Sequence, residues 1–301
     1  MFDLIIIGAG PAGITAAVYA ARKNMSILVI TKDIGGQAAI SGDVENYTGY
    51  QFITGPELSI KFEEHMRRYN IETKENEEVI TIEKKGKLCV VTSNKGSYQA
   101  KTIIVASGKR SKELNVPGEN EFKNKGLTYC ATCDGPLFSQ KSVAVVGGGN
   151  SSLDAVIQLM NIAKKVYIVN INPKLNGDAI MLEKVRSSDK VTIINNAQVR
   201  AVLGDKMVNG LTIKKQGSEE TLAVEGIFVE IGLIPNSEFA KNLDKNEFGE
   251  IKVDSRNQTN IPGIFAAGDV TDVPEKQIVI ACGEGSKACL SAFKYLATSK
   301  F

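Results

Sequence analysis

The sequence has a single histidine, little net charge and no apolar run long enough to span a bilayer. With only His65 available, we expect neither a histidine-based metal centre nor a histidine-dependent catalytic triad. A net charge of +2 and a pI near 8.1 indicate neither a nucleic-acid partner nor a membrane partner. The first apolar stretch, Leu4 to Ile7, is short and lacks a basic lead-in, so it predicts a buried strand and not a signal peptide. We therefore expect a cytoplasmic protein.

Cysteine is also scarce, yet two of the five cysteines stand close together. Structural disulfides are rare in the cytoplasm, where a Cys-x-x-Cys pair indicates redox chemistry or a metal site. Cys130 and Cys133 form such a pair, and two thiols at this spacing can close and reopen a small disulfide. Asp134 follows directly and is a candidate for the proton transfer that this chemistry needs. The segment predicts a redox-active disulfide with Cys130, Cys133 and Asp134 as catalytic residues.

Two other interpretations of these residues stay open at this point. The cysteine pair could be half of a zinc site, which only Cys282 and Cys289 could complete, at an unusual spacing. Asp134 precedes Gly135, and an Asp-Gly pair is common in turns. We expect Cys89, Cys282 and Cys289 to be packing residues, and we expect no metal site.

A glycine-rich turn near the start of the chain indicates a dinucleotide site. The expected order around it is strand, turn, helix and strand, at residues 3–7, 8–13, 14–23 and 26–30. In such a turn the first glycine makes the bend, the second lets the backbone approach a pyrophosphate, and the third packs the helix on the strand. The acidic residue expected after the second strand is replaced by Thr31, with Asp33 two residues on.

The same order of elements recurs in the middle of the chain, which indicates an internal duplication. The second copy covers Ser142–Val146, Gly147–Ser152, a helix to about Asn161, and Val166–Val169. After its second strand, a site for NADP needs arginine for the 2′-phosphate, and a site for NAD needs an acid for the ribose hydroxyls. Residues 170–176 offer one lysine, no arginine and no acid. The nucleotide fold is kept, while the residues that select NADP or NAD are missing.

The remaining segments predict one domain inserted in another, in a chain long enough for two. The expected elements are a helix at Pro56–Arg68, an antiparallel sheet at 79–82, 88–92 and 97–100, strands at 102–106, 191–194, 199–203, 211–214, 226–231 and 264–267, and a final helix after Gly283-Glu284-Gly285. Pro117-Gly118 and Gly232–Asn236 break the chain near the two crossings. The predicted fold is α/β, with two dinucleotide-binding, Rossmann-like, three-layer domains, the first from 1–110 and 236–301 and the second from 111–235.

Several motifs resemble those of the low-molecular-weight thioredoxin reductases, and the resemblance covers essentially the whole chain. The motifs are GAGPAG from Gly8, GGQ from Gly35, VENYTG from Val44, ASG from Ala106, CATCDG from Cys130, GGGNSS from Gly147, IGLIPN from Ile231 and AAGDV from Ala266. A CATCDG segment between two dinucleotide turns is highly specific. The resemblance implies an FAD-dependent thioredoxin-disulfide reductase that works through Cys130 and Cys133, with thioredoxin as its partner, and a homodimer.

The resemblance also implies which residues hold FAD. The pyrophosphate would lie at the first glycine-rich turn, Asp269 would bind the ribityl chain, and Lys276 would lie near the flavin where the family pattern has arginine. The implied FAD-binding residues are Gly8, Gly10, Pro11, Ala12, Gly13, Thr31, Gly35, Gly36, Gln37, Asn46, Val79, Ala106, Ser107, Gly108, Gly268, Asp269, Val270, Lys276, Gln277 and Ile278.

The resemblance breaks at the electron donor. Family members that use NADPH carry a His-Arg-Arg stretch and a further arginine where residues 170–176 stand here, so this chain resembles the ferredoxin-dependent flavin thioredoxin reductases. A ferredoxin near roughly −400 mV would reduce a thioredoxin near roughly −270 mV with about 6 kcal/mol released for two electrons. Reduced ferredoxin is therefore the expected donor. The alternatives are an NAD(P)H-dependent enzyme that uses Lys174 with Lys164 or Lys165, and a flavin-bearing redox sensor without turnover.

Overall fold

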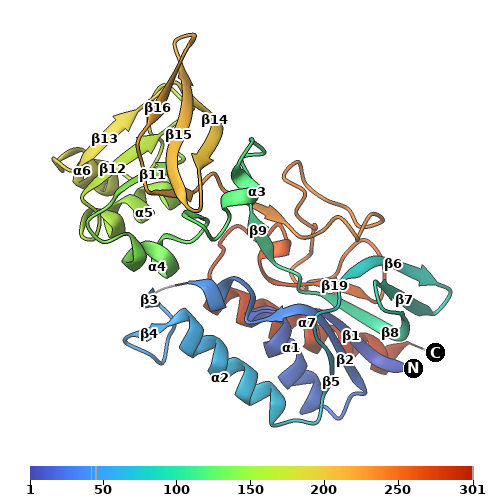
Figure 1. The fold of residues 1–301 in the computed structure, drawn as a ribbon. Helices are drawn as coiled ribbons and strands as arrows, with labels where there is room; N and C mark the ends of the chain where they lie inside the picture. The colour runs from blue at the N-terminus through green and yellow to red at the C-terminus, as the bar shows by residue number, and fades with distance from the viewer. Residues whose placement is uncertain (42, 45, 300–301) are drawn as a thin grey trace. The chain divides into compact units, whose positions relative to one another are not determined.

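The computed structural model describes residues 1–41, 43–44 and 46–299, with the backbone only at Asp43, Thr132 and Cys133. The chain divides into two compact units, Met1–Arg110 with Ile234–Phe301 (unit 1) and Ser111–Leu233 (unit 2). Unit 2 is a continuous segment inserted in the sequence of unit 1 (Figure 1). It ends two residues before the expected boundary at residue 235.

Unit 1 is built on a seven-stranded sheet in the order β5-β2-β1-β8-β7-β6, with β19 paired to β8. Five of these strands run parallel, and β7 and β6 add an antiparallel arm to β8. The strands are β1 Phe2–Ala9, β2 Ile27–Ile34, β5 Glu72–Lys74, β6 Val79–Lys85, β7 Leu88–Ser93, β8 Ser97–Val105 and β19 Ile264–Ala266.

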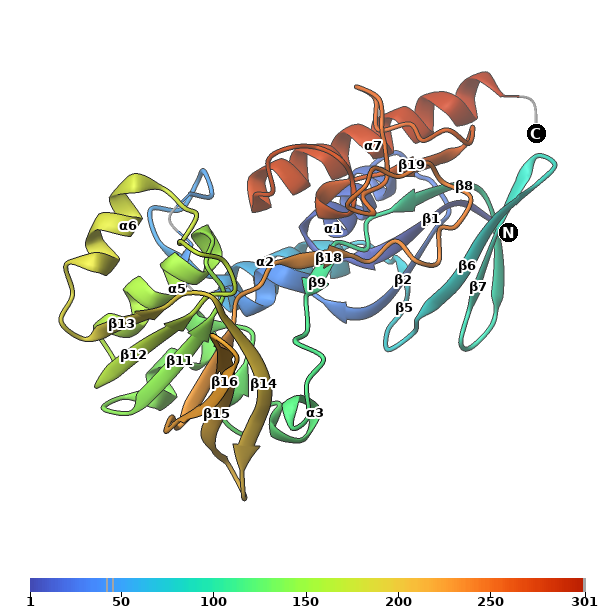
Figure 2. The same ribbon diagram turned by 90° about the horizontal axis from the view of Figure 1, so that it is seen from above.

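Successive side chains of β1 belong to two different cores, as the pleat of a strand requires. Leu4 and Ile6 pack with α1 and α7, and Ile5 and Ile7 belong to the core on the opposite face, which the segment 239–253 covers. The helices of unit 1 are α1 Pro11–Ala21, α2 Gly55–Arg67 and α7 Ile278–Thr298. Figure 2 shows α7 beside α1 along one face of the sheet. Both faces of the sheet are therefore covered, as an α/β fold requires.

Unit 2 holds a five-stranded parallel sheet in the order β10-β17-β11-β12-β13 and an antiparallel sheet β14-β15-β16. Val143 and Val145 of β11 pack against α5, and Ala144 and Val146 pack against β14 and β15. The elements are β10 Leu127–Thr128, α4 Ala131–Asp134, β11 Ser142–Val146, α5 Asn150–Met160, β12 Lys165–Val169, α6 Ala179–Arg186, β13 Val191–Ile194, β14 Ala197–Gly204, β15 Val208–Lys215, β16 Ser218–Leu222 and β17 Gly226–Val229.

Short elements complete the described part of the chain. They are β3 Asp43–Val44, β4 Ile53–Thr54, β9 Lys109–Ser111, α3 Glu119–Phe122, β18 Leu233–Pro235 and the 3₁₀ turns Gly36–Ile40, Gly135–Phe138 and Gly268–Val270. β9 and β18, where the chain leaves and re-enters unit 1, pair in a two-stranded sheet. Among the described residues, no helix has the length and apolar character needed to cross a membrane.

The start of the final helix differs from the expectation. α7 begins at Ile278, so Gly283 and Gly285 lie inside the helix and not before it. A Cβ on Gly285 would overlap the backbone carbonyl of Ala12 in α1. This glycine therefore serves close helix packing, a role that a sequence pattern does not separate from a turn.

Three further elements differ from the expectation. The strands expected at 97–100 and 102–106 are the single strand β8, whose first half pairs with β7 and whose second half pairs with β19. β16 and α6 were not expected at all. Four of the five β16 residues are exposed, and Val185 is the only fully buried residue of α6, so neither element has the apolar pattern that marks a strand or helix.

Candidate functional site

Unit 1 contains a cavity of about 1050 Å³ at the carboxyl ends of its parallel strands. In open α/β sheets, ligands bind at this edge. The volume is at the top of the usual range for ligand pockets, roughly 300–1,000 Å³, as an extended dinucleotide requires. All the expected FAD-binding residues line this cavity except Gly13, Gly35 and Val270.

The first glycine-rich turn shapes one wall of this cavity. A Cβ on Gly8 would overlap Ala106 O, and a Cβ on Gly13 would overlap Gly8 O, so these two glycines allow backbone segments to pack. Gly10 has only Gly35 O near its Cβ position, at 3.9 Å, and it caps α1 without a side-chain acceptor. The first N–H groups of α1 are thus available to an anion in the cavity.

Thr31 lines the cavity, but its hydroxyl is engaged within the protein. Its Oγ1 accepts from Ala9 N–H at 3.1 Å and donates to Asp33 O. The side chain is 5% exposed. Thr31 therefore fixes the glycine-rich turn, and it does not replace the ribose-binding acid that is missing here.

Two expected residues that are far apart in sequence meet at this cavity. Asn46 Nδ2 donates to Gln277 Oε1 at 2.9 Å, so the loop after β3 is joined to the residue that caps α7. The structure also places Lys109, Asn236 and Glu238 in the cavity lining, which the sequence did not indicate as ligand contacts. Only Asn236 had given a signal, as the last residue of the IGLIPN motif.

A second cavity, of about 960 Å³, lies in unit 2 at the second glycine-rich turn. It is lined by Gly147 to Ser151 and by Asn170 at the end of β12. Asn170 is 1% exposed, and its side-chain nitrogen Nδ2 donates to Asn172 O at 3.1 Å and to Asn195 Oδ1 at 2.9 Å. The residue that stands where a ribose-binding acid is expected is therefore saturated by protein partners.

The lysines proposed from sequence for this second cavity do not line it. Lys164, Lys165 and Lys174 are absent from its lining, whereas Lys112 and Arg200 are in it. Arg200 comes from β14, about thirty residues beyond the strand end at which a sequence motif would place it. Its guanidinium is 3.6 Å from Glu219 and is half exposed.

Cys130 forms a disulfide bond in unit 2, and the side chain of Cys133 lies outside the described atoms. Thr128 anchors this segment, because its hydroxyl donates to Asp134 Oδ2 and accepts from Cys130 N–H at 3.2 Å. Asp134 N–H in turn donates to Cys130 O at 3.2 Å. Asp134 therefore takes part in the turn and also presents a carboxylate beside the disulfide segment.

The other three cysteines are free thiols. Cys89 and Cys289 are fully buried, and Cys282 lies 3.8 Å from the Tyr47 hydroxyl. Burial raises the pKa of all three thiols, that of Cys289 to about 12. Within the part of the chain that is described, no group of three or more His, Cys, Asp or Glu side chains is arranged to hold a metal ion.

Residues 2–285 match the family described as pyridine nucleotide-disulphide oxidoreductase. The chain belongs to this family. An NADH dehydrogenase of Ferdinandcohnia aciditolerans is 42% identical over 98% of this chain and 57% of that protein. A component of the alkyl hydroperoxide reductase of Xanthomonas campestris pv. phaseoli is 45% identical over 98% of this chain and 57% of that protein. The chain thus spans little more than half the length of these curated relatives.

Solved thioredoxin reductases match the chain along its whole length. The Lactococcus lactis enzyme has a TM-score of 0.88 at 35% identity, over 99% of this chain and 100% of that one. The T. acidophilum enzyme has a TM-score of 0.84 at 39% identity, over 97% and 98%. A ferredoxin-flavin thioredoxin reductase from Clostridium acetobutylicum has a TM-score of 0.55 at 30% identity, over 99% of each chain. The predicted fold is confirmed, and this chain is a thioredoxin reductase-like flavoprotein with FAD as its cofactor.

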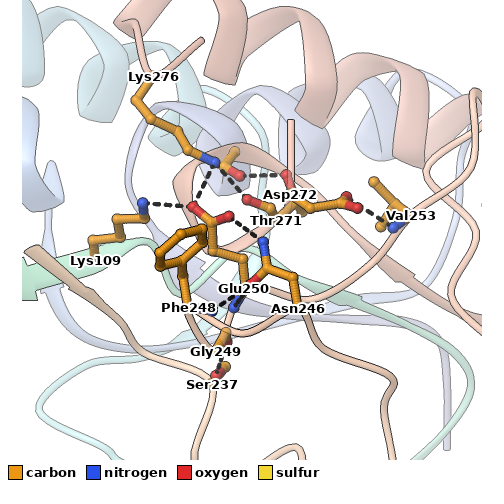
Figure 3. A network of polar contacts seen from close by, with 11 residues as sticks. Lys109, Ser237, Asn246, Phe248, Gly249, Glu250, Val253, Thr271, Asp272 and Lys276 are labelled. Carbon is orange, nitrogen blue, oxygen red and sulfur yellow. Dashed lines mark hydrogen bonds and ion pairs between the residues drawn. The ribbon is translucent and has the colours of Figure 1, made fainter. Parts of the chain in front are cut away.

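The charges of unit 1 fit this cofactor. Lys109 and Lys276 line the cavity of unit 1, and both converge on Glu250, at 2.8 and 3.2 Å (Figure 3). Asn246 Nδ2 donates to the second oxygen of Glu250 at 2.6 Å. Asp269 also lines the cavity, where burial raises the pKa of its carboxyl and the two lysines oppose that rise. The cavity therefore presents cations and several carboxyls, Asp269 and Glu238 among them, to the phosphates and hydroxyls of a dinucleotide.

Proposed function

We propose that this chain is an FAD-dependent reductase of thioredoxin-type disulfides, in which Cys130 and Cys133 pass electrons from the flavin to the protein substrate. The observation that carries the proposal is the Cys130 disulfide, held by Thr128 in a chain that also contains an FAD cavity. FAD, when bound, accepts electrons from a soluble donor and delivers them in pairs.

The chain's own residues then account for disulfide exchange. We assign Cys133 to the flavin side and Cys130 to the attack on the substrate. The Cys130 thiolate attacks one sulfur of the substrate disulfide to give a mixed disulfide, and the Cys133 thiol displaces it. The substrate gains two electrons and two protons, and the Cys130–Cys133 disulfide is restored. Asp134, oriented by the Thr128 hydroxyl, supplies and takes back the proton of the departing thiolate.

We propose NADH as the electron donor. The 960 Å³ cavity at the second glycine-rich turn has the position and the size for a pyridine nucleotide. Relatives at 42% and 45% identity include an NADH dehydrogenase. No cluster of arginines stands at the end of β12, so NADPH lacks its usual partner for the 2′-phosphate.

Reduced ferredoxin, which was the donor expected from the sequence, is the second candidate. It is favoured by Asn170, which is saturated by protein partners and leaves no acid for the ribose hydroxyls. The similarity to the ferredoxin-flavin thioredoxin reductase of Clostridium acetobutylicum also favours it. Thioredoxin as the substrate, a homodimer and a cytoplasmic location complete the proposal.

Anaerobic titration of the bound flavin decides between the donors. We expect NADH at micromolar concentration to bleach the flavin within seconds, with NADPH far slower. Bleaching by reduced ferredoxin alone would overturn the NADH proposal in favour of ferredoxin. Steady-state turnover with thioredoxin separates an enzyme from a redox sensor, and full turnover by Cys133→Ser would overturn the disulfide mechanism.

A further inference from the structure

Strand order in unit 2 places one residue between the disulfide and the second glycine-rich turn. β17 lies between β10, which leads to Cys130, and β11, which leads to Gly147. Glu230 is the first residue after β17, and its N–H donates to Val146 O at 2.8 Å. Because parallel strands end at the same edge of a sheet, Glu230 stands between the two functional segments.

The carboxylate of Glu230 binds a group from each of these segments. Ser151 Oγ, in the first turn of α5, donates to Glu230 Oε2 at 2.9 Å. The N–H of Ala131, which belongs to the peptide bond directly after Cys130, donates to the same carboxylate. Glu230 also lines the cavity of unit 2. One side chain thus joins the disulfide segment, the glycine-rich turn and the cavity.

The surroundings of Glu230 bring its ionisation close to neutral pH. The pKa of Glu230 is raised to about 7, chiefly by burial and also by the charge of Asp154 on α5, while the hydrogen bonds from Ser151 and Ala131 oppose the rise. The cavity that Glu230 lines also holds the charged side chains of Lys112, Glu113 and Arg200. Asp134 lies three residues after Ala131 on α4 and is bound by Thr128.

We propose that Glu230 is a positioning residue that ties the Cys130 segment to the second glycine-rich turn and holds a carboxylate against the peptide bond after Cys130. This inference rests on the proposed disulfide reductase function and deepens it. An ionised carboxylate held at this peptide bond places a negative charge beside Cys130. A nearby like charge disfavours a thiolate, so ionised Glu230 raises the pKa of the Cys130 thiol.

The test measures the Cys130 thiol in the FAD-loaded full chain carrying Cys133→Ser. The alkylation rate of Cys130 by iodoacetamide is followed from pH 5.5 to 9.5 by mass spectrometry of its peptide. Cys89 and Cys289 are buried and give unreactive references in the same digest. No electron donor or thioredoxin is used, so the result is independent of whether the chain turns over.

In the Cys133→Ser chain, which is the parent here, we expect the plot of Cys130 alkylation rate against pH to show a second inflection near pH 7, caused by Glu230. Glu230→Gln should remove this inflection, lower the pKa of Cys130 by about one unit and speed alkylation at pH 7 by about tenfold. Glu230→Asp keeps the charge and should retain the inflection. Glu225→Gln is the matched control, because Glu225 stands at the opposite end of β17 and accepts from Ser142 N–H.

Two results would overturn the proposal. One is a single inflection in the alkylation profile of the Cys133→Ser chain. This result can be obtained even if no Glu230 variant folds. The other is a Glu230→Gln profile identical to that of Glu225→Gln. Hydrogen exchange of the Ala131 amide tests the positioning role separately. We expect exchange at least about tenfold faster in Glu230→Ala than in Glu230→Gln, whose carbonyl can still accept. Equal rates in the two variants would contradict this role.

Discussion

Lys109 Nζ lies 2.8 Å from Glu250 Oε1, and each side chain is only 12% exposed. Lys109 begins β9, at the point where the chain leaves unit 1, and Lys276 reaches the same carboxylate from the loop before α7. Both lysines line the FAD cavity. Glu250 is therefore the shared counter-ion of two ammonium groups, whose side chains are 12% and 22% exposed.

Loss of this shared counter-ion should be costly. Glu250→Gln leaves two partly buried ammonium groups without their ion-pair partner, so we expect the free energy of unfolding at pH 7 to fall by about 3 kcal/mol. Urea denaturation of the FAD-loaded protein measures it. Glu83→Gln is the matched control, because Glu83 pairs with Lys85 at a half-exposed position outside the cavity lining. That change should stay within about 0.5 kcal/mol, and equal losses in the two variants would show that burial is not the cause.

The role of Asp134 can be separated from its place in a turn. Asp134→Asn keeps a residue that suits the turn before Gly135 but cannot exchange a proton, so we expect thioredoxin turnover to fall about 100-fold. Thr128→Val keeps the acid and removes the hydroxyl that orients it. In this second variant we expect turnover with thioredoxin to fall only several-fold. Unchanged turnover of Asp134→Asn across pH 6 to 9 would make the residue purely structural.

Glu230 should also leave a signature in the pH dependence of stability. Its folded-state pKa of about 7 lies above the usual value of 4.5, so the folded chain binds the extra proton. Stability therefore falls as the pH rises from about 4.5 to 7 and is level above that range. Glu230→Gln removes this loss, and we expect it to gain about 1–3 kcal/mol relative to the parent between pH 5 and pH 8. Chemical denaturation at pH 5 and at pH 8 checks this. Glu225→Gln is expected to show the same pH dependence of stability as the parent.

The sequence predicted the parts of the site that depend on local geometry. Gly8 and Gly13 were predicted because the glycines of a turn between a strand and a helix stand at fixed intervals in the sequence. Cys130 and Cys133 were predicted because a redox disulfide needs two thiols close together in the chain. Glu230 and Arg200 were missed because they reach the second cavity from other strands. Their positions depend on strand order, which single-sequence patterns do not contain.

The same limit explains the two glycines inside α7. Gly283 and Gly285 look alike in sequence, yet a Cβ on Gly283 would meet no atom within 4 Å, while a Cβ on Gly285 would overlap Ala12 O. Tertiary packing alone distinguishes them. A periodicity argument therefore placed the start of the helix after both glycines.

Alanine at each position should give opposite results. Gly283→Ala replaces an exposed helical glycine without a clash, so we expect a gain of about 1 kcal/mol in the free energy of unfolding. Gly285→Ala pushes α7 away from α1, so we expect a loss of about 1–3 kcal/mol. Ala12, the residue that would be displaced, lines the cavity of unit 1 within the first glycine-rich turn, where we expect the FAD pyrophosphate. Gly285→Ala should therefore also weaken FAD binding by at least about tenfold, measured by fluorescence titration of the apoprotein, while Gly283→Ala should bind FAD like the parent. Equal FAD affinity in the two variants would show that the contact between α1 and α7 does not set the geometry of the cofactor turn.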